Sequence, residues 1–213
     1  MKAIILAAGR GSRMGNKTET LPKCLTTLWG KTLLEHQLTA IKQAGIEEIA
    51  VVTGYKAEEI CKHKPNLTYF HNENWANTNM VATLLKAESW LNSDTCHVSY
   101  ADIIYESAAI TALLNNTDNI ALTYYTEFLQ LWEKRFDNPL DDLETFKIDG
   151  NSYLKEIGQK PQTVNEVEVK LSILVDTFYT SKILIGVKQR SLLNKNIWTA
   201  FPLEAYLRWR SKS

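Results

Sequence analysis

Short apolar runs and segments with helical periodicity alternate along the first 125 residues of the chain. The continuous apolar runs predict buried strands at residues 2–8, 48–53, 67–70, 96–100 and 120–125. Apolar residues three and four positions apart predict helices at 33–44, 56–62, 81–91 and 107–114. This alternation favours an α/β fold, a Rossmann-like three-layer sandwich with a mostly parallel central sheet.

A different pattern follows at 145–148 and 153–157, where two short strand-like runs flank Asp149-Gly150. An Asp-Gly pair between two such runs predicts a hairpin with a type I′ turn.

Polar or glycine-rich segments come directly after several of the predicted strands. They are the loop from Gly9, the pair Gly54-Tyr55, the polar stretch 72–79 and Asp102. In open α/β sheets, ligands bind beyond the carboxyl ends of the strands. We therefore expect these four segments to converge on one edge of the sheet.

The first of these loops, LAAGRGSRMGNKTETLPKCL at 6–25, carries the clearest chemical signal. Gly9 and Gly11 allow the backbone to approach a ligand closely, so that successive N–H groups face phosphate oxygens. Arg10, Arg13 and Lys23 add three cations, which fit a triphosphate. The loop lacks the Walker A pattern, and its glycine spacing differs from the dinucleotide-binding fingerprint.

Length and composition exclude several classes of protein. The 213 residues suit one domain, with room for an appended piece, and 45% of them are hydrophobic. The 24 basic and 24 acidic residues leave no net charge, which argues against a nucleic-acid-binding protein. No apolar run approaches the roughly 18 residues of a membrane-spanning helix, so no stable membrane insertion is expected. The three cysteines form no CxxC motif and predict reduced thiols in a cytoplasmic protein.

The neutral total hides two dissimilar parts of the chain. Residues 169–213 contain eight basic and two acidic residues, a net charge of +6, whereas residues 1–168 carry −6. This asymmetry suggests a division between a domain at 1–168 and a basic C-terminal segment at 169–213.

The glycine-rich loop resembles that of the nucleotidyltransferases that activate phosphorylated metabolites with CTP, UTP or dTTP. The resemblance rests on LAAG-x-G-x-R-M at 6–14 followed by PKCL at 22–25, and it covers roughly residues 1–168. It continues through TGY at 53–55, N-x-x-W-x-x-T-N-M at 72–80, SYADI at 99–103 and IGQKP at 157–161. The last-named motif and TNM look most like the phosphocholine cytidylyltransferase-like branch. The resemblance implies a GT-A-like nucleotidyltransferase fold.

The same resemblance implies a role for individual residues. Arg13 and Lys23 would be catalytic, and Asp102 would bind Mg²⁺. Lys160 and Trp132 would meet the substrate. The residues implied in nucleotide binding are Leu6, Ala8, Gly9, Gly11, Gly54, Tyr55, Asn79 and Ala101.

Structural roles remain as alternatives for several of these residues. Asn79 is also a turn-forming residue type, and Lys160 suits a position beside a hairpin. Tyr55, Trp75 and Trp132 suit packing as well as ligand contact.

The chain departs from the family pattern near its C-terminus. The family's second metal carboxylate, in an E-[IV]-D element, has no counterpart, because the only carboxylates after Glu168 are Asp176 and Glu204. We hypothesise that the segment from about Val169 is a divergent or frame-shifted replacement, which would lower or abolish activity.

The expected function is transfer of a nucleoside monophosphate, CMP from CTP in preference, to a small phosphorylated acceptor such as phosphocholine, with release of pyrophosphate. One alternative is a sugar-1-phosphate nucleotidylyltransferase. A second is a catalytically impaired nucleotide-binding protein that lacks the second carboxylate. A homo-oligomer is compatible with the sequence, which does not reveal the oligomeric state.

Overall fold

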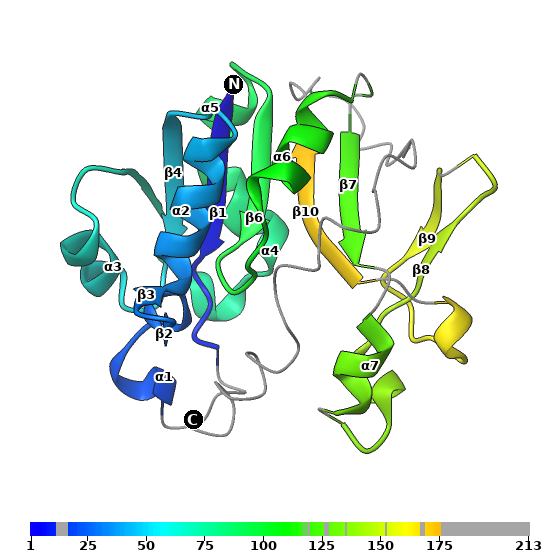
Figure 1. The fold of residues 1–213 in the computed structure, drawn as a ribbon. Helices are drawn as coiled ribbons and strands as arrows, with labels where there is room; N and C mark the ends of the chain where they lie inside the picture. The colour runs from blue at the N-terminus through cyan, green and yellow to red at the C-terminus, as the bar shows by residue number, and fades with distance from the viewer. Residues whose placement is uncertain are drawn as a thin grey trace.

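A six-stranded sheet forms the centre of the molecule (Figure 1). The computed structural model describes residues 1–11, 17–116, 118, 120–125, 128–134, 136–151, 153–166 and 169–175. The strand order is β5-β4-β1-β6-β10-β7, and β5, β4, β1 and β6 pair in parallel. Their bounds are β1 Lys2–Ala7, β4 Glu48–Thr53, β5 Thr68–His71, β6 Cys96–Tyr100, β7 Ile120–Tyr125 and β10 Val169–Val175.

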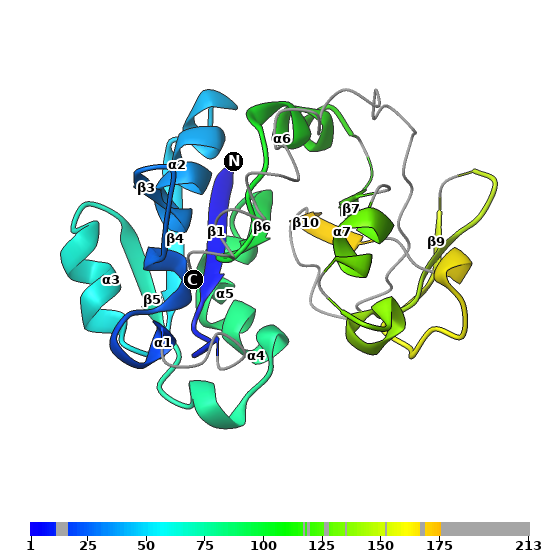
Figure 2. The same ribbon diagram turned by 60° about the horizontal axis from the view of Figure 1, so that its bottom comes forward.

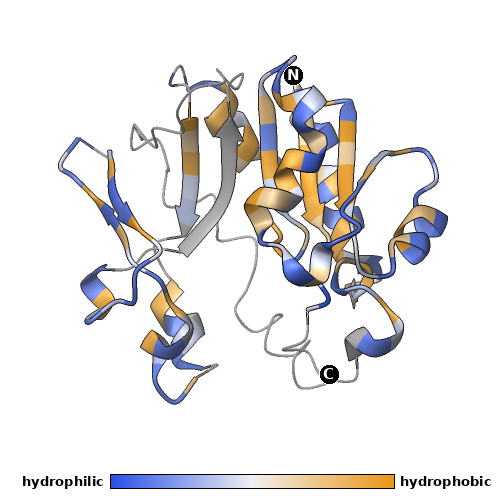
Figure 3. Cartoon of the chain, turned by 180° about the vertical axis from the view of Figure 1, so that it is seen from behind, coloured by the Kyte–Doolittle hydropathy of each residue, from blue (hydrophilic) through white to orange (hydrophobic). Residues whose placement is uncertain are grey.

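Helices cover both faces of this sheet, which confirms the predicted three-layer α/β architecture. Successive residues of β1 point to opposite faces, so Ile5 packs into one apolar cluster and Ile4 into another. The first cluster includes residues of α2 (Leu33–Gln43), α3 (Ala57–His63) and α6 (Ser107–Leu114). The second includes residues of α4 (Met80–Leu84) and α5 (Glu88–Leu91). Strands β1 and β4, at the centre of the parallel part, are accordingly hydrophobic along most of their length (Figure 3).

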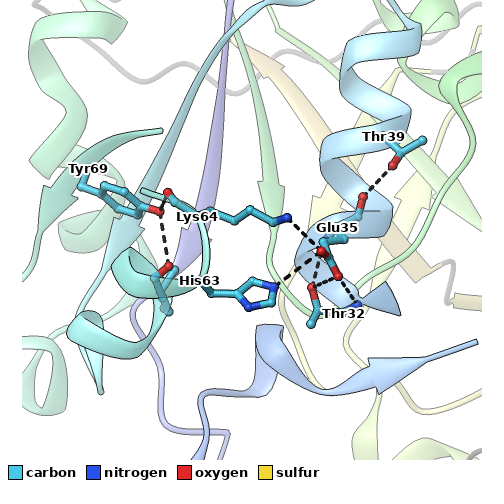
Figure 4. Close-up of polar contacts among 7 residues, drawn as sticks. Thr32, Glu35, Thr39, His63, Lys64 and Tyr69 are labelled. Carbon is cyan, nitrogen blue, oxygen red and sulfur yellow. Dashed lines mark hydrogen bonds and ion pairs between the residues drawn. The ribbon is translucent and has the colours of Figure 1, made fainter. Parts of the chain in front are cut away.

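Helix α2 begins with a capping box. The Thr32 hydroxyl accepts a hydrogen bond from the Glu35 amide at 3.1 Å, and the Glu35 carboxylate accepts one from the Thr32 amide at 2.8 Å (Figure 4). Lys64 also donates to the Glu35 carboxylate, at 2.8 Å. The Lys64 ammonium and the Thr32 amide together hold the pKa of Glu35 at about 2. The start of α2 is therefore fixed to the end of α3.

The hairpin of β8 (Phe146–Ile148) and β9 (Leu154–Ile157) packs on β7, where Phe146 and Leu154 surround Leu122. The predicted type I′ turn is wrong, because five residues, 149–153, join the strands. The Asp149 carboxylate accepts hydrogen bonds from the amides of Asn151 and Tyr153, both at 2.9 Å. These bonds favour a longer loop than the two-residue turn expected for Asp-Gly.

The predicted helix at 81–91 is interrupted. Helices α4 and α5 are separated by a 3₁₀ turn at Leu85–Ala87, which lets Ala87 and Leu91 both face the sheet.

The remaining elements are α1 Lys17–Thr20, α7 Phe128–Glu133, β2 Thr27–Leu28, β3 Lys31–Thr32 and 3₁₀ turns at Lys23–Leu25, Trp75–Asn77, Pro139–Asp142 and Val164–Glu166. Within the described residues, none of the helices has the length and apolar character needed to cross a membrane.

Strand β10 lies between β6 and β7 and runs antiparallel to both. It comprises the first residues of the basic segment 169–213, and residues 176–213 lie outside the described residues. The division of the chain at residue 168 stays a prediction. The sheet itself includes residues from both sides of that boundary.

Candidate functional site

Four segments that follow strands are joined at the carboxyl edge of the parallel strands, which Figure 2 turns toward the reader. The Tyr55 amide donates to the Ala8 carbonyl at 2.9 Å, which connects the loops after β4 and β1. The Ala101 amide donates to the Leu6 carbonyl at 3.1 Å, which connects the end of β6 to β1. The Asn72 amide donates to the Thr53 carbonyl at 2.8 Å. The segments singled out from the sequence therefore meet at one edge, as expected.

Lys23 and Asp102 form an ion pair at this edge, although 79 residues separate them in the chain. Each side chain is about one third exposed, at 32% for Lys23 and 40% for Asp102. Gly11 lies beside the lysine with φ of 69°, and a β-carbon there would come within 3.1 Å of the Lys23 Cβ. Glycine at position 11 therefore gives the loop both its left-handed conformation and the room for the Lys23 stem.

Cys24 follows Lys23 in the chain but has a different environment. Its side chain is buried, and burial raises the pKa of the thiol to about 12. The thiol therefore stays protonated at neutral pH and is a poor nucleophile.

Gly54 is packed tightly between two other loops. A β-carbon at this position would lie 2.6 Å from the Trp75 Cβ and 2.8 Å from the Ala8 carbonyl oxygen. The rings of Trp75 and Tyr55 are in edge contact, with centroids 5.3 Å apart. Trp75 thus packs against the loop after β4, in agreement with the structural alternative for this residue.

Two cationic side chains lie near the Tyr55 ring. The Arg10 guanidinium carbon lies 5.8 Å from the ring centroid and the Lys56 ammonium 5.7 Å from it. The Tyr55 hydroxyl donates to the Glu19 carbonyl at 3.2 Å, which connects the loop after β4 to α1. The first loop is therefore attached to the rest of the edge through an aromatic ring as well as through the backbone.

Buried and capping amides shape the loop after β5. Asn72 is fully buried and donates to the hydroxyls of Thr78 and Thr83, at 2.8 and 2.9 Å. Asn79 is the N-cap of α4, and its side-chain oxygen accepts from the Ala82 amide at 3.0 Å. Asn79 has a capping role, which leaves its side-chain nitrogen for another partner.

Two residues predicted to meet the substrate lie in a different part of the fold. Lys160 is exposed and follows β9, whose hairpin packs on β7. Trp132 belongs to α7 and packs edge-on against Phe128, with ring centroids 6.2 Å apart. Arg13 lies outside the described residues. Of the charged residues predicted for the site, the structure thus brings together Lys23 and Asp102, with Arg10 near Tyr55.

Within the described residues, no cluster of three or more His, Cys, Asp or Glu side chains is arranged to hold a metal ion. The buried amide of Gln37 was not predicted from the sequence. It donates to the carbonyls of Tyr100 and Ile103, both at 2.7 Å, on either side of Asp102.

Comparisons with known proteins agree with this architecture. A family model described as the MobA-like NTP transferase domain matches residues 3–151. The chain is 37% identical over 179 residues to the CTP:phosphoglutamine cytidylyltransferase of Campylobacter jejuni, covering 80% of this chain and 70% of the relative. It is 39% identical over 106 residues to the choline-phosphate cytidylyltransferase of Haemophilus influenzae, covering 49% of this chain and 45% of the relative.

A solved structure supports the fold. The inositol-1-phosphate CTP transferase from T. maritima superposes with a TM-score of 0.62 at 16% identity, covering 82% of this chain and 70% of the other. At this identity the similarity is one of fold alone.

Proposed function

The chain belongs to the family of MobA-like NTP transferase domains, and we propose that it transfers CMP from CTP to a small phosphorylated or phosphonate acceptor. A phosphate oxygen of the acceptor would attack the α-phosphorus of CTP. A new P–O bond forms, the bond between the α- and β-phosphates breaks, and pyrophosphate leaves.

The observation that carries this proposal is the Lys23–Asp102 pair beside the glycine-rich loop. The ammonium has the charge needed to bind a phosphate oxygen, and the carboxylate has the charge needed to bind a cation. Both are partly exposed at the edge where ligands bind in open α/β sheets. Catalysis of phosphoryl-type transfer depends chiefly on such positioning and charge stabilisation.

We assign Lys23 to the α-phosphate and Arg13 to the pyrophosphate that leaves. The nucleotide would lie along Leu6, Ala8, Gly9 and Gly11 on one side. On the other side, the site would be lined by residues from the neighbouring loops, namely Gly54, Tyr55, Asn79 and Ala101.

Asp102 suits a magnesium ion that is shared with the nucleotide. Mg²⁺ prefers oxygen ligands and is commonly held by one or two carboxylates together with substrate phosphates. A partly exposed carboxylate opposite a phosphate-binding lysine fits that donor set. Bound there, the ion would neutralise charge on the phosphates and orient them for in-line attack.

The acceptor is proposed from the relatives' names and from chemistry. The names of the two cytidylyltransferases specify phosphoglutamine and choline-phosphate as acceptors. We assign Lys160 to the acceptor phosphate and Trp132 to its organic part. This assignment requires the hairpin and α7 to reach the acceptor when it is bound.

The compartment is also a proposal. Cys24 and Cys96 are buried and Cys61 is half-buried, and all three are free thiols. Free thiols are usual in a reducing compartment, so we infer that the protein acts in the cytoplasm.

The test is a measurement of pyrophosphate release with each of the nucleotides CTP, UTP, ATP and dTTP. Each nucleotide is combined with four acceptors in turn: phosphocholine, 2-aminoethylphosphonate, phosphoglutamine and glucose-1-phosphate. We expect turnover with CTP and a non-sugar acceptor, and no turnover without Mg²⁺. Turnover only with glucose-1-phosphate would replace the proposal by a sugar-nucleotide synthesis. Nucleotide binding without turnover of any acceptor would make the chain a binding protein.

A lysine variant tests the assigned charge. Lys23→Met should lower kcat/KM by about 10²-fold or more, the usual effect of removing one stabilising charge at a reacting centre. Lys2→Met is the matched control, because Lys2 also forms an ion pair, with Glu48, at the opposite ends of β1 and β4. Equal activity of the two variants would contradict the role of Lys23.

A further inference from the structure

Gln37 is a polar side chain on the apolar face of α2. The residues one turn before and after it, Leu33 and Ile41, belong to the buried face of the helix. Gln37 is itself fully buried, with no exposed surface. Burial of a side-chain amide costs free energy unless its hydrogen bonds are made. The hydrogen-bond partners of Gln37 therefore indicate its role.

Both N–H groups of the Gln37 amide are directed at one short segment of backbone. They donate to the carbonyl oxygens of Tyr100 and Ile103, each at 2.7 Å. The amide oxygen accepts a hydrogen bond from the Ser99 hydroxyl at 3.0 Å. The two carbonyls bracket Ala101 and Asp102, so a single side chain holds the backbone on both sides of the aspartate.

The same helix is also attached to the segment that carries Lys23. The Leu33 amide, at the start of α2, donates to the Thr26 carbonyl at 3.0 Å, and the Thr26 amide donates to the Lys23 carbonyl at 3.0 Å. Leu25 is buried in the cluster that includes α2. Both members of the Lys23–Asp102 pair are therefore attached to α2. Lys23 is attached through backbone hydrogen bonds, and the backbone around Asp102 is attached through the Gln37 side chain.

We propose that Gln37 is a positioning residue that fixes the direction of the Asp102 carboxylate and thereby sets the affinity of the site for its divalent cation. The inference rests on the proposed function, in which Asp102 binds that cation with the nucleotide. Residues that orient a metal ligand typically change metal affinity by about 10–100-fold when they are replaced.

The main variant is Gln37→Met, which keeps nearly the same length and volume but donates no hydrogen bond. Its matched control is Ser99→Ala, which removes only the hydrogen bond to the Gln37 oxygen and leaves both bonds to the carbonyls. Gln37→Glu is a second variant, with at most one proton to donate, and serves if Gln37→Met does not fold.

The first measurement needs no ligand. Amide hydrogen exchange in a peptide that spans residues 99–106 should be at least about tenfold faster in Gln37→Met than in the unmodified chain, because the carbonyls on both sides of Asp102 lose their donor. Ser99→Ala should exchange like the unmodified chain. Unchanged exchange in Gln37→Met would overturn the inference even if the protein is a cytidylyltransferase.

The second measurement separates positioning from a general loss of structure. The Mg²⁺ concentration for half-maximal pyrophosphate release with CTP should rise about tenfold in Gln37→Met, while the KM for the acceptor stays unchanged. A lower kcat with the Mg²⁺ requirement unchanged, or an equal effect of Ser99→Ala, would reduce Gln37 to a packing role. Absence of turnover in the unmodified chain would instead refute the proposed function, and Mn²⁺ binding in the presence of CTP would then test Gln37.

Discussion

Gly54 is the residue at which the site is most sensitive to one added methyl group. Its absent β-carbon would overlap Trp75 and the Ala8 carbonyl, at 2.6 and 2.8 Å. Relief of that overlap requires one of two loops to move. We expect Gly54→Ala to lower the free energy of unfolding by about 1–3 kcal/mol, as measured by urea denaturation.

Gly150→Ala is the control for this substitution. No atom lies within 4 Å of the β-carbon position of Gly150. We therefore expect little change in stability from this variant, and equal losses for the two would show that the contact with Trp75 is unimportant.

At the level of single residues, motifs identified the charged pair and the glycines, because their spacing alone is distinctive. The buried amides of Gln37 and Asn72 were missed, because glutamine and asparagine usually face solvent. Gln37 left a signal in the sequence. It occupies a position of the apolar stripe of α2, where a leucine or isoleucine is expected.

The capping box of α2 is an element whose contribution can be measured. Thr32→Ala should lower the free energy of unfolding by about 1 kcal/mol, since it removes the acceptor for the Glu35 amide. Thr39→Ala, in the same helix, is the control, because the Thr39 hydroxyl only donates to the Glu35 carbonyl within the helix. Equal effects of the two variants would argue against capping.

The capping box also predicts that the free energy of unfolding depends on pH. Lys64 and the Thr32 amide lower the pKa of Glu35 from 4.5 to about 2. The ionised carboxylate thus stabilises the fold above about pH 4.5, and this contribution decreases as the pH falls toward 2. Glu35→Gln should lose stability near pH 6 and show a smaller decrease over that pH range, as measured by chemical denaturation at a series of pH values.

The strands and helices of the first 125 residues could be predicted well because each has a clear hydrophobic period. Strands β4, β6 and β7 and helix α6 have the predicted bounds. The break between α4 and α5 was not predicted, since the apolar positions continue through Leu85 without proline or glycine. The five-residue loop after β8 was not predicted, because it depends on side-chain hydrogen bonds of Asp149 rather than on residue type.

For the molecule as a whole, His97 makes the free energy of unfolding depend on pH in a second range. It is fully buried on β6, and burial lowers its pKa from 6.5 to about 4. The folded state therefore keeps His97 neutral in a range of pH where the unfolded chain binds a proton. The contribution of neutral His97 to the free energy of unfolding should be fully present above about pH 6.5. It should decrease by about 3 kcal/mol as the pH falls to 4.

His97→Leu should remove most of this decrease in the free energy of unfolding between pH 6.5 and 4. His71→Gln, at an exposed position, is the control and should retain it. A decrease that survives in His97→Leu would assign the effect to other groups.

The position of β10 has a consequence for the newly made protein. Among the described strands, β7 pairs only with β10, and β10 alone covers that side of β6. Until residue 175 has left the ribosome, the edge of β6 is open to pairing with other chains, and such edges promote aggregation during synthesis. Pairing of β10 with β6 joins residues at least 73 positions apart in the sequence, from Ser172 and Ser99 onward, and such a long-range step favours slow folding and dependence on chaperones.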